Sequence, residues 1–203
     1  AKEDTLAAMK RRNDDAEDIE AREWNRLVYG DDYWINRLAT KTSVDAITRA
    51  DLAAFHKRLA VPANLVVAMS GDFKRAEMLA KLDATLGSWK EKGVASPAVP
   101  QPAGSAKPGV YLVDKTDVNQ GRVSIGHLGG KRPIADEAAL MVANDIYGGG
   151  GFTAWMMLRI RSDEGLAYGA YSNYEVGDLI PGEFRAYFQS KSATCARAAQ
   201  LTL

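Results

Sequence analysis

Residues 147–168 read YGGGGFTAWMMLRIRSDEGLAY, and this stretch decides how the rest of the chain is organised. It contains the four successive glycines 148–151. Glycine loses more backbone entropy on folding than any other residue, so such a run indicates a place where the backbone takes a positive φ or another backbone comes close. The following residues 152–161 have apolar side chains available for a core and predict a helix.

Residues 165–168 (GLAY) predict a turn that leads from this helix into a strand. A chain that doubles back there would bring the Arg161 guanidinium near the Tyr168 phenol. Both groups can donate hydrogen bonds to a carbonyl oxygen. The alternative is purely structural: the glycines cap a helix, Arg161 is a solvated charge and Tyr168 is a half-buried strand residue.

The composition is that of an ordinary globular protein. The 203 residues are 46% hydrophobic and 26% charged, with a formal net charge of zero. A neutral chain gives no electrostatic support for binding nucleic acid or an anionic membrane, and no apolar run approaches the length of a membrane span. The chain starts in one predicted helix and stops in another, so we expect a fragment of a longer protein.

In residues 1–90, before the proline-rich segment, the pattern predicts helices with one buried strand between them. Residues 3–29 predict a long amphipathic helix that breaks near Asn13. Thr48 is a candidate N-cap with Asp51 at the capping-box position. Residues 64–73 (NLVVAMSGDF) predict a buried strand, and Arg75 begins another helix.

Residues 91–108 are rich in proline, alanine, glycine and serine, which is typical of an extended linker. After it the pattern restarts with predicted strands at 109–114, 122–127, 167–175 and 183–189, and with a helix at 136–146. Helices mixed with paired strands in this way predict an α+β fold, with sheets covered by helices.

Several short motifs resemble the insulinase/pitrilysin family of zinc metallopeptidases, which includes the mitochondrial processing peptidases. The string from Arg161 to Tyr168 matches that family's Arg-x-x-x-Gly-Leu-x-Tyr motif without a gap. The passage from Ile47 to Phe73 resembles the end of the family's N-terminal homologous half. The resemblance implies that residues 1–90 end one half, 91–108 link the halves, and 109–203 begin the C-terminal half. The sheets would then be mixed sheets belonging to two homologous-half fragments.

The family's zinc site does not fit this sequence. Its inverted His-x-x-Glu-His motif is absent, and the two histidines, His56 and His127, lie far apart. An ungapped alignment back from Tyr29 places the third ligand, a glutamate in the family, at Ala8. We therefore predict no metal site in this chain and expect zinc in a partner half or partner subunit.

The resemblance then implies a function in peptide hydrolysis. Arg161 and Tyr168 would reach into the active site of a zinc-bearing homologous half or subunit, bind the peptide substrate and stabilise the oxyanion. Gly149, Gly150, Gly151 and Phe152 would line the substrate site. We expect no nucleic-acid partner and no membrane span, and we favour the periplasm over the cytoplasm. Two alternatives remain: a non-catalytic structural or binding homologue on the same fold, and a fragment of a complete zinc peptidase.

Overall fold

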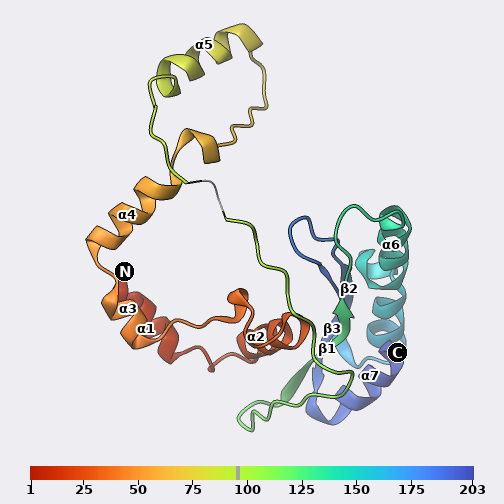
Figure 1. Ribbon diagram of the computed structural model, residues 1–203. Helices are drawn as coiled ribbons and strands as arrows, with labels where there is room; N and C mark the ends of the chain where they lie inside the picture. The colour runs from red at the N-terminus through yellow and green to blue at the C-terminus, as the bar shows by residue number, and fades with distance from the viewer. Residues whose placement is uncertain (95–96) are drawn as a thin grey trace. The chain divides into compact units, whose positions relative to one another are not determined.

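The computed structural model describes residues 1–94 and 97–203, and these residues form two compact units (Figure 1). Apart from the first two residues, the sheet unit comprises residues 3–39 and 99–203. The helical unit comprises residues 40–98, without 95 and 96. Those two residues of the predicted linker lie outside the described residues. The predicted boundaries between homologous halves stay a prediction.

The sheet unit is built on one three-stranded antiparallel sheet with the order β1-β3-β2. The strands are β1 (Gln120–Leu128), β2 (Ala167–Tyr174) and β3 (Glu183–Lys191). They match three of the predicted strands, and the α+β class is confirmed. Where mixed sheets were expected, the described residues form this single antiparallel sheet.

Helical segments cover the sheet. The α-helices of this unit are α1 (Lys2–Lys10), α2 (Ala16–Tyr29), α6 (Glu137–Asn144) and α7 (Cys195–Thr202). Two segments are π-helical: η3 (Asp145–Gly149), which includes the first two glycines of the run, and η5 (Met157–Asp163), which follows the run. Short 3-10 turns are η1 (Trp34–Asn36), η4 (Gly151–Thr153) and η6 (Ser192–Thr194).

The predicted break in the N-terminal helix separates α1 from α2. Asp15 is the N-cap of α2, and its carboxylate accepts a hydrogen bond of 2.7 Å from the Glu17 N–H. Such a bond satisfies one of the free N–H groups at a helix start. Gly30, with φ of +94°, ends α2 in a conformation that favours glycine.

The core lies between the sheet and the helices that follow the glycine run. Helices α6 and α7 lie on one side of the sheet, whereas α2 lies on the other (Figure 1). Ala170 of β2 and Phe188 of β3 are buried against Met156 and Ile160. Because Met156 and Ile160 belong to the motif at 147–168, this packing holds the motif against the sheet.

A polar cluster attaches α2 to the opposite face of the sheet. The Arg185 side chain donates to Ser124 Oγ at 2.9 Å and pairs with Glu20. Trp24 Nε1 donates to the Glu183 carboxylate at 2.6 Å. Burial raises the pKa of Glu183 above its ordinary value. Each of these three half-buried charged groups therefore has a hydrogen-bonding partner, which lowers the cost of its burial.

The helical unit contains α3 (Lys41–Ala46), α4 (Arg49–Leu59), the 3-10 turn η2 (Pro62–Asn64) and α5 (Arg75–Leu86). The predicted capping box of α4 is confirmed: the Thr48 side chain accepts from the Asp51 N–H, and the Asp51 carboxylate accepts from the Thr48 N–H. Among the described helices of the whole chain, none is long and apolar enough to cross a membrane.

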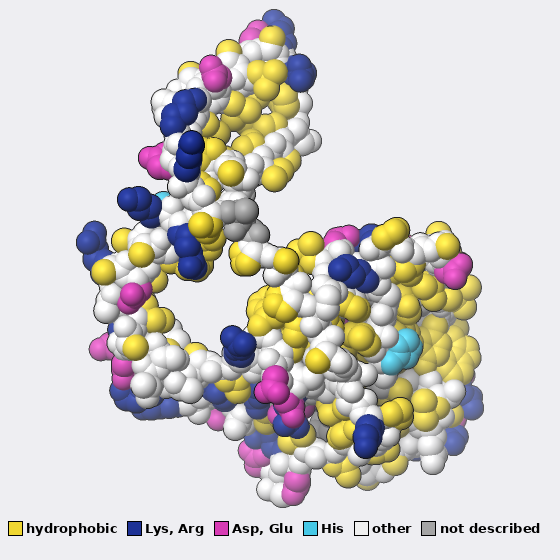
Figure 2. All heavy atoms as spheres, viewed as in Figure 1, with side chains coloured by type: hydrophobic (Ala, Val, Ile, Leu, Met, Phe, Trp, Pro, Cys, Tyr) yellow, Lys and Arg dark blue, Asp and Glu magenta, His cyan; other side chains and the backbone are white. Residues whose placement is uncertain are grey.

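Two predicted strands were wrong. Residues 64–73 and 109–114 run without a strand partner in the described part of the chain. Val66 is 92% exposed and Leu112 is 90% exposed. Hydrophobic side chains gather around the segment between η2 and α5 (Figure 2). An apolar run becomes a strand only when a neighbouring strand accepts and donates its backbone hydrogen bonds.

Candidate active site

The glycine run combines a close backbone approach with a left-handed turn. A Cβ atom at Gly148 would lie 2.5 Å from the Ser172 backbone nitrogen of β2, so only glycine lets η3 pack this closely. Gly151 has φ of +71°, the left-handed region that glycine adopts without strain. Both uses predicted for the run are therefore present. Gly149 and Gly150 lie between these positions and are exposed.

The helix predicted over residues 152–161 is present, but it begins later and ends later than predicted. Phe152 belongs to the 3-10 turn η4, and the helical segment then leads into η5, which ends at Asp163. Insertions of π-helix occur frequently at functional sites. Here η5 carries Arg161 in its last turn.

A tight turn then reverses the chain from η5 into β2. Gly165 has φ of +63°, and its N–H donates to the Arg161 carbonyl at 3.1 Å. The Leu166 N–H donates to the Ile160 carbonyl at 2.9 Å. Leu166 also packs against the buried core, which fixes the turn in place.

This reversal brings Arg161 and Tyr168 together, with Phe152 beside them. The Arg161 guanidinium carbon lies 5.3 Å from the centre of the Tyr168 ring and 4.9 Å from the centre of the Phe152 ring. Both distances are within the range of cation–π attraction. Three side chains from η4, η5 and β2 thus form one cluster, which we call the Arg161 cluster.

The Arg161 guanidinium keeps its hydrogen-bond donors available. Within residues 1–94 and 97–203, no carboxylate lies within 4.0 Å of it. The adjacent Glu164 instead pairs with Arg159 at 3.5 Å and with Arg197 at 3.3 Å. An arginine stays charged at any ordinary pH and presents five N–H donors. The cluster can therefore bind an oxygen that carries negative charge.

Tyr168 projects from an irregular part of β2. The pairing register with β3 shifts between Ala167 and Ala170, and such irregularities redirect a side chain. Tyr168 is 88% exposed. Its ring borders an open depression of about 380 Å³, whose other lining residues include Gln189 and Lys191.

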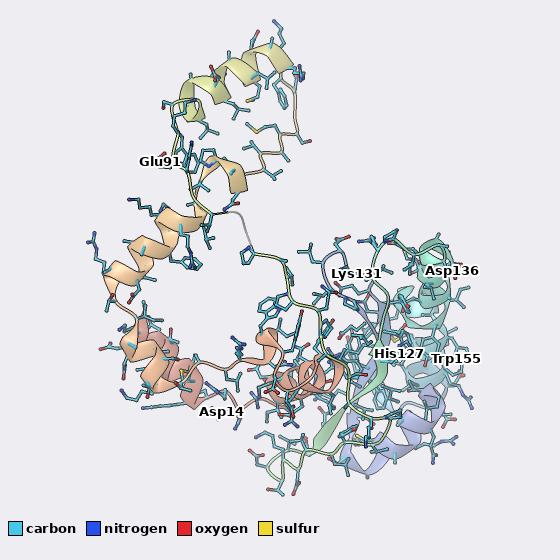
Figure 3. All side chains as sticks on the ribbon, viewed as in Figure 1. Asp14, Glu91, His127, Lys131, Asp136 and Trp155 are labelled. Atoms are coloured by element: carbon cyan, nitrogen blue, oxygen red, sulfur yellow. The ribbon has the colours of Figure 1, made fainter. Side chains whose placement is uncertain are left out.

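The residues present do not fit a zinc ion. No group of three or more His, Cys, Asp or Glu side chains that could hold a metal occurs among the described residues. His56 lies exposed on α4 in the helical unit. His127 lies on β1, where its ring packs 5.6 Å from that of Phe184 (Figure 3). Ala8 on α1 offers only a methyl group.

Two contacts, one in the site and one between α2 and the sheet, could not be found from the sequence. Phe152 was predicted to contact substrate, but its stacking on Arg161 depends on the left-handed turn at Gly151. The pairing of Glu20 with Arg185 joins residues far apart in the chain. No local spacing indicates either contact.

Comparison with known proteins identifies the relatives of this chain. Residues 46–203 match the family described as the peptidase M16 inactive domain. An uncharacterized zinc protease of Mycobacterium leprae is 30% identical over 207 residues, covering 96% of this chain and 46% of that protein. The chain therefore spans about half the length of this curated relative.

Solved structures show the same fold. The peptidase M16 inactive domain from Pseudomonas fluorescens matches with a TM-score of 0.80 and 25% identity, over 99% of this chain and 48% of that one. The periplasmic protease PqqL from Escherichia coli matches with a TM-score of 0.76 and 18% identity, over 99% of this chain and 22% of that one.

Proposed function

The chain belongs to the peptidase M16 family, and from this premise we propose that it works as the zinc-lacking half or partner subunit of a two-part peptidase. In this proposal it binds the peptide substrate and stabilises the oxyanion during hydrolysis. The zinc-bearing half is either a separate chain or another part of the same protein. The relatives are about twice as long, so the activity of the whole protein is part of the proposal.

The observation that carries the proposal is the Arg161 cluster. Arg161 has no carboxylate within pairing distance in the described structure, and the phenol beside it is exposed. Hydrolysis of a peptide places negative charge on the carbonyl oxygen, and donors already aimed at that charge stabilise the transition state. A guanidinium and a phenol are suitable donors for this purpose.

The glycine run and Phe152 help to position the peptide substrate. Gly149, Gly150 and Gly151 carry no side chains, so the main chain of a peptide can approach the turn closely. Phe152, at the end of this turn, supplies an apolar contact for the substrate. When bound in the partner half, a zinc ion would supply an activated water as the nucleophile. The residues described here bind, orient and stabilise charge.

The test is reconstitution of activity. The chain is mixed with each zinc-bearing M16 chain encoded in the same genome, and cleavage of an unstructured peptide is followed. With the correct partner, we expect Arg161→Ala to lower the rate about 10²- to 10³-fold, as typically found when one oxyanion donor is removed. Arg159→Ala, which removes an arginine already paired with Glu164, serves as the matched control. Full turnover by Arg161→Ala would refute the assignment.

The same experiment distinguishes the proposed peptidase half from a non-catalytic homologue on the same fold. If the chain binds peptide but no zinc-bearing partner gains activity from it, a binding role without turnover is favoured.

For the compartment we propose the periplasm, as found for the Escherichia coli structural neighbour. Fractionation of cells that express the natural gene would test this, and recovery in the cytoplasmic fraction would contradict it.

A further inference from the structure

We propose that the rings of Phe152 and Tyr168 select peptides with a bulky apolar side chain next to the carbonyl that Arg161 holds. This inference rests on the proposed function and adds the class of substrate. Phe152 is then the residue that sets specificity, whereas Arg161 and Tyr168 bind the reacting group.

The first support is the exposure of two aromatic rings around one cation. Phe152 is 70% exposed and Tyr168 is 88% exposed, although both contact the guanidinium of Arg161. Each ring therefore leaves most of its apolar surface in water. A large apolar side chain of a ligand would cover that surface, and this burial is favourable.

The second support is that the backbone holds Phe152 in place. Gly151 takes its left-handed conformation, and the Ala154 N–H donates to the Gly151 carbonyl at 3.1 Å. Ala154 is 1% exposed, which anchors the end of the turn in the core. An aromatic side chain on an anchored turn loses little conformational entropy when it binds a partner.

The third support is that the Arg161 guanidinium attracts both aromatic rings. Its attraction to the ring faces holds the aromatic side chains beside the donors instead of letting them fold away. A carbonyl at Arg161 then places the neighbouring side chain of the peptide against a ring. The competing possibility is that Arg161 recognises an acidic side chain directly.

The experiment measures peptide binding to the full chain by fluorescence anisotropy. The probes are labelled Ala/Ser/Gln peptides in which one position in turn is Phe, Ala or Asp. We expect the best Phe peptide to bind about 3- to 10-fold more tightly than its Ala counterpart, because an aromatic contact is worth that range of affinity. In Phe152→Ala this preference should disappear, whereas Phe152→Trp should keep it.

Two further variants separate this inference from the proposed function. Leu158→Ala removes another exposed apolar side chain of η5 and should leave the preference intact. Arg161→Ala should weaken the binding of every peptide, including the Ala peptides. An unchanged preference in Phe152→Ala, or a preference for Asp over Phe, overturns the inference alone. Absence of peptide binding to the natural chain, or binding indifferent to Arg161→Ala, overturns the proposed function as well.

Discussion

Gly148 lies where the π-helical segment η3 passes closest to strand β2, and it is buried there. A Cβ atom at this position would meet the Ser172 backbone nitrogen at 2.5 Å and the Met156 sulfur at 2.9 Å. Because one of these atoms is backbone in the sheet, the clash cannot be relieved by a side-chain rotation. The glycine therefore sets the distance between the turn that carries Phe152 and the strand that carries Tyr168.

We predict that Gly148→Ala lowers the free energy of unfolding by about 1–3 kcal/mol, the usual cost of overpacking a well-packed site. Gly109→Ala is the matched control, because its Cβ would find only ordinary contacts, the nearest at 3.7 Å. Urea unfolding of both variants measures the difference. Equal stability of the two would show that η3 does not pack against β2 as described.

Glu183 makes the stability of the fold depend on pH. Its pKa is raised by burial and by the nearby charges of Glu175 and Glu20, against the opposing effects of Trp24 and Arg185. A raised pKa means that the folded state disfavours the ionised carboxylate. The contribution of this group to stability is therefore fully present below the ordinary glutamate pKa and is lost as the pH rises through the raised pKa.

We predict that Glu183→Gln removes this loss, since glutamine still accepts the hydrogen bond from Trp24. The melting temperature of the variant should gain on that of the natural chain as the pH rises from acidic to neutral. Glu3→Gln, at an exposed position on α1, controls for the change in net charge. A gain that is the same at acidic and neutral pH would contradict the prediction.

Sequence proximity explains which contacts between residues were predictable. Only a helix end and a glycine turn separate Arg161 from Tyr168, so their approach follows from local chain reversal. The pairing of Glu20 with Arg185 depends instead on how α2 docks on the sheet, which no local pattern encodes. The same limit applies to the ring of Phe152, which reaches Arg161 only through the turn at Gly151.

At the scale of elements, helices were predicted better than strands. The capping box of α4 lies within four consecutive residues, so Thr48 and Asp51 carry the whole signal. The run at 64–73 has the apolar composition of a buried strand, but strand formation also needs partners that a composition does not supply. In the helical unit, α4 and α5 bury none of their residues.

The absence of a strand at 64–73 leads to a prediction for two valines of the helical unit, one buried and one exposed. Val61 is 1% exposed, whereas Val66 is 92% exposed. Val61→Ala should destabilise α4 by about 1–3 kcal/mol, from lost burial plus the cavity left behind. Val66→Ala should change stability by less than about 0.5 kcal/mol, as exposed substitutions usually do. Hydrogen exchange of the α4 amides measures both. An equally large cost at Val66 would show that residues 64–73 are buried in solution.

At the scale of the whole molecule, the chain has the M16 fold, but the residues that the structure describes lack the donor set of a zinc enzyme. The relative from Mycobacterium leprae carries the name zinc protease, and this chain covers 46% of its length. In the described residues, His56 and His127 belong to different units and no third donor accompanies either. Family membership therefore accounts for the fold, whereas the residues present determine what this chain itself can do.

We predict that the purified chain retains far less than one zinc ion per molecule after dialysis, as measured by elemental analysis. A zinc site needs several N, O or S ligands arranged around one point, and isolated histidines bind too weakly to survive dialysis. Ala8→Glu is an informative companion, because it places a carboxylate where the sequence analysis expects the third ligand of the family but supplies no histidine pair. The variant should remain as free of zinc as the natural chain. Stoichiometric zinc in the natural chain would instead indicate a self-sufficient peptidase, and the assignment of this chain as the zinc-lacking partner would then be wrong.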